Sequence, residues 1–167
     1  QKRIAILLVI FFIFGVVLLP KNLGGEGVNL LRTASIEARY ESMQNGMTIF
    51  SKYPFTGVGF NAYRYAQKKE GLLDQKWDQT HSGAGVSNSY IFLLATTGVI
   101  GLALFLISWV KLANGILATD QKTNFLKGAV IASVAGVAVH GFFDNTIFYS
   151  SILIWLYLLI GFFMADK

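Results

Sequence analysis

Three arginines in the least apolar part of the chain carry side chains suited to holding a phosphate: Arg32, Arg39 and Arg64. A guanidinium offers paired N–H groups to phosphate oxygens, and a site beside a bilayer strengthens that contact because the local dielectric constant is low. The sequence therefore predicts that these arginines hold a diphosphate or another phosphate-linked substrate. The alternative is that they contact anionic lipids or pair with Glu37 and Glu41.

His81 lies in the same polar segment, and histidine is the side chain that titrates nearest neutral pH. It is predicted to act as a general base that takes a proton from a hydroxyl group. The alternative is a solvated loop histidine without a catalytic role. Asn88 follows a few residues later, and its amide is predicted either to cap a helix or to reach the substrate.

A second group of polar and small residues lies toward the C-terminal end. Its members recur every three or four residues along one helix face: Ala129, Ser133, Gly136, His140 and Asp144. Small residues allow close contact between helices, and ionisable groups within a membrane usually serve a function. His140 and Asp144 are therefore secondary site candidates, or else a pair that fixes the turn of a helical hairpin.

Several kinds of chemistry are excluded by the composition. The chain has no cysteine, which removes disulfides, thiolate metal sites and cysteine nucleophiles. It has two histidines and no Walker, dinucleotide-binding, HExxH or GxSxG motif, so we expect neither a metal site nor a cofactor. The net charge of +5 favours anionic partners such as lipid headgroups and phosphates, whereas the lack of a dense basic run argues against nucleic acid.

The composition is that of an integral membrane protein. Of the 167 residues, 54% are hydrophobic and 14% are charged, whereas soluble domains have about 25% charged residues. The chain opens at Gln1, directly before an apolar run. We therefore expect a piece of a longer protein that lacks an N-terminal part.

Four apolar stretches predict an all-α, polytopic bundle, because backbone groups in lipid must be hydrogen-bonded within helices. The predicted transmembrane helices are residues 1–19 (with a truncated start), 88–110, 128–143 and 147–165. Basic residues flank the ends that would share one side, and the positive-inside rule assigns that side to the cytoplasm. Residues 111–127 then form a cytoplasmic loop, and residues 20–87 form a large extracytoplasmic loop.

The extracytoplasmic loop is predicted to contain an amphipathic helix that lies at the membrane surface. Apolar side chains recur at helical spacing, opposite a polar face, at Tyr40, Met43, Met47 and Phe50. Pro54 and two glycines that follow it end this helix and force turns. The loop would thus hold its polar side chains next to the headgroups of the bilayer.

Three stretches resemble, in order, segments of the O-antigen ligase and polymerase superfamily. ARYESMQNGMTIFSKYPFTGVGFNAYR, residues 38–64, is similar to the family's arginine, helix and P-x-x-G-x-G turn. SNSYIFLLATTGVIGLALFL, residues 87–106, resembles its segment in which an asparagine precedes a G-x-x-G pattern. VHGFFDNTIFYSSILIWLYLLIGF, residues 139–162, is similar to its closing hairpin. The resemblance covers most of the chain.

The resemblance implies a metal-independent glycosyltransferase of the outer membrane leaflet. Such an enzyme takes a glycan from an undecaprenyl diphosphate carrier and joins it to an acceptor glycan. It acts as a ligase or a polymerase for lipopolysaccharide and other cell-surface polysaccharides. Arg39 matches the family arginine that precedes the glycine turn, and loop arginines of the family bind the diphosphate. The expected location is the bacterial inner membrane, with the active loop on the extracytoplasmic side.

The chain departs from the family at one position. The family histidine commonly stands directly before the motif asparagine, where this chain has Ser87 before Asn88. The resemblance therefore implies that His81 reaches the same point through the bend at Gly83 and Gly85. If it does not, the chain is a diverged polymerase or an inactive relative.

Two other classes of protein also fit the pattern. One is a transporter or flippase subunit for a lipid-linked glycan, with His140 and Asp144 lining a pathway. The other is a non-catalytic membrane subunit that uses the loop for docking. The predicted spans are nearly free of charge and the loop is not, which favours an enzyme over a transporter.

Overall fold

The computed structural model of the chain describes residues 33–73, 85–119 and 124–165. The chain divides into two compact units, Gln1–Ile36 and Glu37–Lys167. Almost all of the described residues belong to the second unit, and the contacts below lie within it.

Three of the sequence predictions fall on other parts of the chain. The first predicted span, residues 1–19, lies outside the described residues, as do Arg32 and His81. The described residues are helical and include no strand, which confirms the all-α class. The number of membrane spans stays a prediction.

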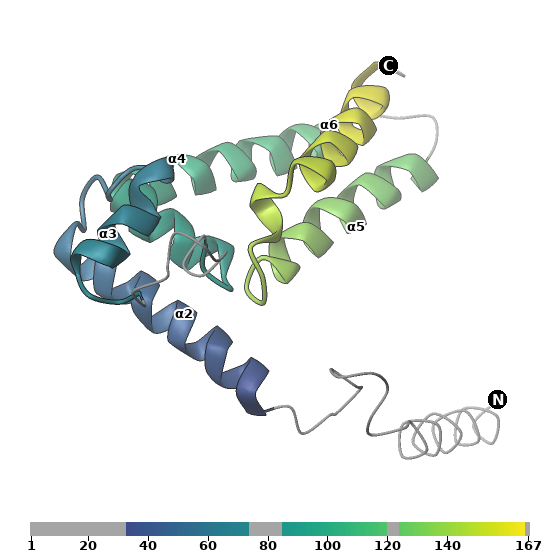
Figure 1. Ribbon diagram of the computed structural model, residues 1–167. Helices are drawn as coiled ribbons and strands as arrows, with labels where there is room; N and C mark the ends of the chain where they lie inside the picture. Colours follow the sequence, from purple (N-terminus) through teal and green to yellow (C-terminus); the bar gives the residue numbers. More distant parts are fainter. Residues whose placement is uncertain (1–32, 74–84, 120–123, 166–167) are drawn as a thin grey trace, which may run out of the picture. The chain divides into compact units, whose positions relative to one another are not determined.

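The described elements are helices and 3-10 turns (Figure 1). In chain order they are α2 (Thr33–Lys52), η1 (Phe60–Ala62), α3 (Tyr63–Lys69), α4 (Ser89–Ala118), α5 (Asn124–His140), η2 (Thr146–Phe148) and α6 (Ser150–Ala165), where η marks a 3-10 turn. Among them, α4 alone is long and apolar enough to cross a membrane, whereas α5 and α6 are apolar but shorter. α4 continues well past residue 110, where the sequence places the end of a span.

α4 begins at a side-chain cap, which is one of the two roles that the sequence predicts for Asn88. The side-chain oxygen of Asn88 accepts the backbone N–H groups of Tyr90 and Ile91, each at 3.0 Å. These are among the N–H groups at the start of a helix that have no partner within the helix itself.

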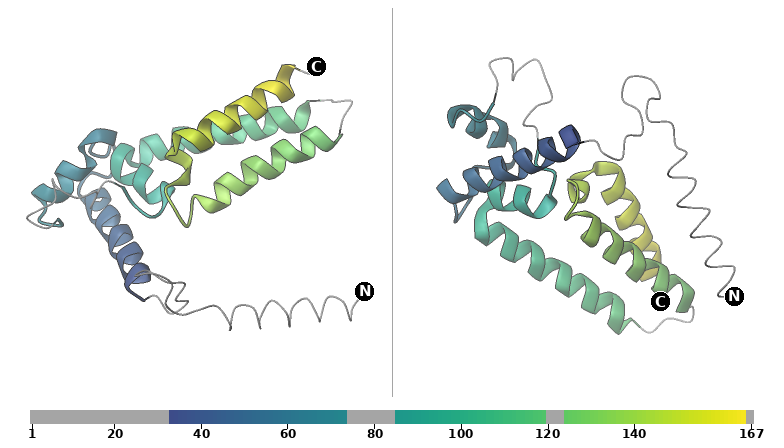
Figure 2. Two further views of the ribbon diagram at one scale, coloured as in Figure 1. Left: turned by 45° about the vertical axis from the view of Figure 1, so that its right-hand side comes forward. Right: turned by 90° about the horizontal axis from the view of Figure 1, so that it is seen from below.

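α4 breaks at Gly98, which has φ 67° and ψ −170° instead of helical angles. In a regular helix, Val99 and Ile100 would donate to the carbonyls of Ala95 and Thr96, four residues earlier. The break separates these partners and leaves two N–H groups and two carbonyls to be satisfied elsewhere. The bend is visible in the right view of Figure 2.

The turn of residues 54–59 supplies the missing backbone partners. The N–H groups of Val58 and Gly59 donate to the carbonyls of Ala95 and Thr96, at 3.1 and 2.8 Å. In the other direction, Val99 N–H donates to Pro54 at 2.8 Å, and Ile100 N–H donates to Phe55 at 3.4 Å. The turn that the sequence places after the amphipathic helix is thus inserted into the broken helix by backbone hydrogen bonds.

Two glycines permit this close contact. A Cβ atom on Gly98 would lie 2.2 Å from the carbonyl oxygen of Phe55, and one on Gly57 would lie 2.2 Å from the carbonyl carbon of Thr96. Both glycines also have positive φ, a conformation that side chains with a Cβ disfavour. Glycine is therefore required at both positions for steric and conformational reasons.

Burial changes at the break. Before Gly98, Phe92 and Leu93 of α4 are buried, and Phe92 packs against the rings of Phe60, Tyr63 and Phe148 at centroid distances of 5.0–5.4 Å. After it, α4 exposes apolar side chains at Val99, Ile100, Leu104, Leu106, Ile107, Val110 and Leu117. Removing the ten residues Ser89–Gly98 from the 30 of α4 leaves 20, about 30 Å of helix, which matches the hydrocarbon thickness of a bilayer.

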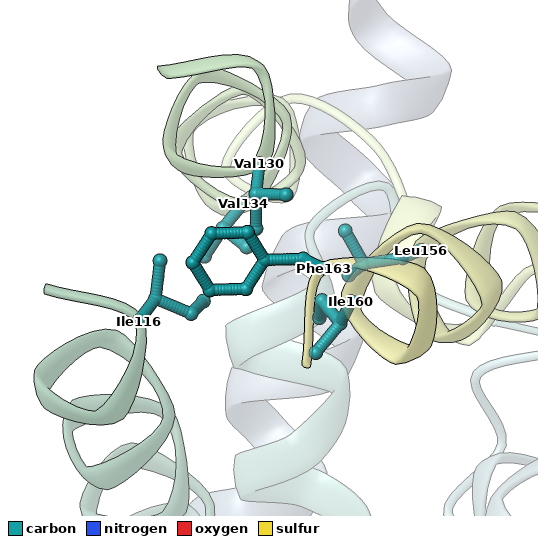
Figure 3. Packing of buried hydrophobic residues seen from close by; sticks show 6 residues of the cluster. All are labelled: Ile116, Val130, Val134, Leu156, Ile160 and Phe163. Carbon is teal, nitrogen blue, oxygen red and sulfur yellow. The ribbon is translucent and has the colours of Figure 1, made fainter. Parts of the chain in front are cut away.

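We call residues 37–73, 85–98 and 141–149 the polar layer, and residues 99–119, 124–140 and 150–165 the apolar layer. The apolar layer has its own core, in which Phe163 of α6 points toward Ile116 of α4 and Val130 of α5 (Figure 3). Its described charged side chains are Lys111 and Lys127. Lys127 donates to the carbonyls of Leu117 and Thr119, at 2.6 and 3.0 Å, and so satisfies the C-terminal end of α4.

Candidate functional site

The candidate site is built around the turn of residues 141–144, which follows α5. Its four consecutive backbone carbonyls each accept a hydrogen bond from a distant part of the chain. Ser89 donates its backbone N–H to the first at 2.8 Å and its hydroxyl to the fourth at 2.9 Å. Asn88 Nδ2 donates to the second at 2.9 Å, and Arg39 Nη1 donates to the third, that of Phe143, at 2.7 Å. The turn therefore joins α2, the start of α4 and the end of α5.

Arg39 projects from α2 toward this turn. Its guanidinium is exposed, and among the described residues it donates one hydrogen bond, to the carbonyl of Phe143. The carbonyls that end α5 carry the negative pole of a helix dipole, which favours a cation at this point. Ser42, one turn further along α2, bonds to Gly85 and Ser87 at 3.4 and 3.1 Å and holds α2 beside the start of α4.

Asp144 is the carboxylate of the same turn, and it is half-buried. Its Oδ1 accepts the backbone N–H of Asn145 at 2.7 Å and the hydroxyl of Tyr149 at 3.3 Å. Within the described part of the chain, no ion pair joins Asp144 to Arg39, although both residues lie at the same turn. The site thus holds a positive and a negative group that do not neutralise each other by direct contact.

Tyr149 responds to both charges. Burial raises the pKa of the Tyr149 hydroxyl, the Asp144 carboxylate raises it further, and the positive charge of Arg39 acts in the opposite direction. The hydroxyl therefore stays protonated at neutral pH and remains a donor to Asp144.

His140 does not pair with the Asp144 side chain, which corrects one of the two sequence interpretations. Its Nδ1 contacts the hydroxyl of Thr146, so the ring bridges the end of α5 to η2. Tyr90 adds a second link by donating its hydroxyl to the carbonyl of Ala138 at 2.7 Å. The hairpin between α5 and α6 is therefore fixed by His140, although through a hydroxyl and not through a carboxylate.

The predicted site residues are thus only partly brought together. Arg39, Asn88 and Asp144 meet at the turn of residues 141–144. Arg64 is half-buried on α3 and interacts with other groups of the protein. Arg32 and His81 lie outside the described residues, so their roles stay predictions.

Sequence reasoning missed three contributors: Ser89, Tyr149 and the carbonyl of Phe143. A backbone carbonyl leaves no trace in a sequence. Ser89 follows the capping asparagine, and Tyr149 follows Asp144 by five residues, but neither spacing is specific enough to reveal a site. Among the described residues, no group of three or more metal-binding side chains is placed to hold a metal ion.

These features define a class of protein: a helical protein whose helices expose apolar side chains and which carries, at one turn, a polar site with an arginine and a carboxylate. The family model for O-antigen ligase matches residues 1–106, which is more than half of the chain. The chain belongs to the O-antigen ligase family, whose members are bacterial inner-membrane proteins with glycan ligase or polymerase roles in polysaccharide and lipopolysaccharide biosynthesis. The resemblance drawn from the sequence is confirmed.

Comparisons with curated proteins and with solved structures gave no match. The family match ends at residue 106, so the turn of residues 141–144 lies beyond it. The two family-like motifs that do fall within the match are joined in space, because the turn of residues 54–59 pairs with the broken helix at Gly98.

Proposed function

We propose that the chain is the site-bearing part of a membrane glycosyltransferase that moves a glycan from an undecaprenyl-diphosphate-linked donor to an acceptor glycan. The polar layer is proposed to lie on the extracytoplasmic side of the bacterial inner membrane. A lipid-tethered donor presents its diphosphate at the membrane surface, where the polar and apolar layers meet. The family and the position of Arg39 both support this proposal.

One observation carries the proposal: Arg39 is held by Phe143 and remains exposed, at the same turn as Asp144. Cleaving the bond between a sugar and a diphosphate places negative charge on the leaving group. A guanidinium that is positioned in advance stabilises this charge without a metal ion. Its paired N–H groups suit the oxygens of a diphosphate.

The remaining roles follow the sequence predictions. Arg32 and Arg64 are proposed to add contacts to the donor, and Asn88 is proposed to order the site through the Phe142 carbonyl and the cap of α4. The reaction also needs a base within hydrogen-bond reach of the acceptor hydroxyl. The candidates for that base are His81, His140 and Asp144.

The test uses the full-length protein in membranes and follows transfer of glycan from an undecaprenyl diphosphate donor. We expect Arg39→Ala to lower kcat/KM by at least about 100-fold, as removal of one preorganised charge-stabilising group does elsewhere. Arg39→Lys should restore part of the loss, because a lysine keeps the charge but not the paired geometry. Lys69→Ala, which removes an exposed cation on α3, serves as the matched control and should behave as the wild type.

Two results would count against the proposal. Wild-type protein that transfers no glycan from lipid-linked donors would remove the enzymatic reading and favour a flippase subunit. Full activity in Arg39→Ala at normal protein levels would show that the Arg39 charge is not used, and a docking role for the loop would then gain support.

A further inference from the structure

We propose that Asp144, oriented by Tyr149, accepts the proton of the acceptor hydroxyl in the transfer reaction. This inference rests on the proposed function and assigns the base that the reaction requires. It makes Asp144 a catalytic residue and Tyr149 a positioning residue.

The geometry around the carboxylate separates its two oxygens. Oδ1 accepts both the Asn145 N–H and the Tyr149 hydroxyl, whereas Oδ2 has no hydrogen bond to any described residue. Two donors on one oxygen fix the plane of the carboxylate and leave the second oxygen to a substrate. A substrate hydroxyl can reach it because Asp144 is only half-buried and Tyr149 is exposed.

The backbone below Asp144 is equally well fixed. The hydroxyl of Ser89 donates to the Asp144 carbonyl, and Asn88 holds the carbonyl two residues earlier. A base contributes most when its position is set before the substrate binds. Asp144 meets this condition through four separate contacts to its own main chain and side chain.

Arg39 and Asp144 carry the charges that the leaving group and the acceptor hydroxyl of one reaction require. Arg39 is tethered to the residue directly before Asp144, yet the two side chains form no ion pair in the described part of the chain. A direct ion pair would leave neither group available to substrates. An arginine bound to the turn from α2 and a carboxylate on the turn can instead hold a diphosphate at one point and an acceptor hydroxyl at the other.

The step balances without a further reactant. The acceptor oxygen forms a bond to the anomeric carbon of the donor glycan. The bond from that carbon to the diphosphate oxygen breaks, and its electron pair leaves with undecaprenyl diphosphate beside Arg39. The hydroxyl proton moves to Oδ2 of Asp144 and is later lost to water.

Ser87 occupies the position of the family histidine, directly before the residues that hold the turn of Asp144. Ser87 donates its backbone N–H to Ser42, and Asn88 and Ser89 hold the turn that carries Asp144. The position that carries a histidine in the resembling family thus lies next to the residues that fix the carboxylate. A histidine introduced at position 87 is therefore expected to replace part of the function of Asp144.

The experiment measures kcat and KM for donor and acceptor in the full-length membrane protein. Asp144→Asn is the central variant, because asparagine keeps an oxygen for the Asn145 and Tyr149 bonds but cannot take a proton. We expect its kcat to fall at least about 100-fold with the KM of the donor unchanged. Tyr149→Phe should lower kcat by roughly 3–10-fold, and adding Ser87→His to Asp144→Asn should restore part of the lost activity.

Matched controls separate the proposal from structural effects. Glu41→Gln makes the same acid-to-amide change on an exposed part of α2, and Tyr157→Phe removes an exposed hydroxyl on α6; both should behave as the wild type. Asp144→Asn protein must also accumulate and resist thermal aggregation as the wild type does.

The outcomes distinguish this inference from the proposed function. If Arg39→Ala abolishes transfer but Asp144→Asn keeps its kcat, the function stands and this inference is overturned. The same holds if His81→Ala or His140→Ala abolishes kcat and Asp144→Asn does not. If wild-type protein shows no transfer at all, the proposed function is wrong, and the assignment of Asp144 as its base is wrong as well.

Discussion

The polar layer and the apolar layer are both helical, but different interactions hold them together. In the polar layer, side chains and backbone groups from distant segments bond to one another at the turn of residues 141–144 and at the break at Gly98. In the apolar layer, the contacts between α4, α5 and α6 are apolar packing around Phe163, with Lys127 closing one end. Along α4, the change from the polar layer to the apolar layer takes place at Gly98.

The difference indicates what each layer contributes. Helices in lipid gain little from hydrophobic burial, because the surrounding chains are as apolar as the core, so packing alone decides their contacts. Hydrogen bonds have defined directions, and a network of them fixes the positions of charged side chains more closely than apolar packing does. The layer that must hold Arg39 and Asp144 in place is accordingly the one in which directional bonds add to a hydrophobic core.

The largest effect is expected at the break itself. Gly98→Val places a side chain against the Phe55 carbonyl and at an unfavourable φ, so the free energy of unfolding should fall by about 4 kcal/mol or more. Unfolding by SDS in mixed micelles measures this loss. The control is Gly136→Val, because a Cβ on Gly136 meets no atom within 4 Å. Equal stability of the Gly98→Val and Gly136→Val variants would show that the pairing at Gly98 does not stabilise the polar layer.

The next effect compares the two cores directly. Phe92→Ala should lower the free energy of unfolding by about 3–5 kcal/mol if the polar layer stands in water, because hydrophobic transfer and cavity terms add. Phe163→Ala should lower it by about 1–2 kcal/mol, because in lipid only packing is lost. Phe162→Ala, an exposed neighbour, is the control. Equal losses for Phe92→Ala and Phe163→Ala would show that the two cores do not differ in their surroundings, water in one case and lipid in the other.

A smaller loss is expected at the cap of α4. Asn88→Ala removes the acceptor for two N–H groups and the donor to Phe142, which should lower the free energy of unfolding by about 1–2 kcal/mol. The same micelle titration measures the loss, with Asn114→Ala, an exposed asparagine of α4, as the control. A loss no greater than that of Asn114→Ala would show that the hydrogen bond from Asn88 to the Phe142 carbonyl is not needed to hold the turn of residues 141–144.

The smallest effect is expected at the ion pair between Lys52 and Glu70, which joins the end of α2 to the end of α3. Lys52 is half exposed, and pairs of this kind contribute about 0–1 kcal/mol. Lys52→Met should therefore change the unfolding midpoint slightly, and added salt should reduce the difference from the wild type. A loss as large as that of Asn88→Ala would show that charge pairing also holds the polar layer together.

Composition and periodicity were enough to predict that three helices form the apolar layer but not where they end: α4 runs to Ala118 instead of residue 110, α5 ends at His140 instead of residue 143, and α6 begins at Ser150 instead of residue 147. The helical class and the polar character of residues 37–73 follow from residue type alone, and the cap is one of the two roles that residue type predicts for Asn88. The sequence also indicates Pro54 and Gly57 as the sites of a turn. It does not reveal that the turn pairs with α4, because the pairing is between backbone atoms.

The candidate site was predictable in its residue types and not in its partners. Arg39 and Asp144 stand out as charged residues, but their common turn depends on contacts across 104 residues of sequence. The amphipathic helix shows the same limit. Periodicity groups Tyr40, Met43, Met47 and Phe50 on one face, whereas in the structure Met43 and Phe50 are partly buried and Tyr40 and Met47 are exposed. Other helices of the protein cover one part of this face and leave the other part exposed, and the periodicity of the sequence does not indicate which part is covered.

The pairing of residues 54–59 with the break at Gly98 also constrains biogenesis. A broken helix that entered lipid alone would carry four unpaired backbone groups, each costing several kcal/mol. Because the turn precedes α4 in the chain, it leaves the ribosome first and is already present when α4 reaches the membrane. The order of synthesis therefore supplies the backbone partners of the break before α4 itself has been made.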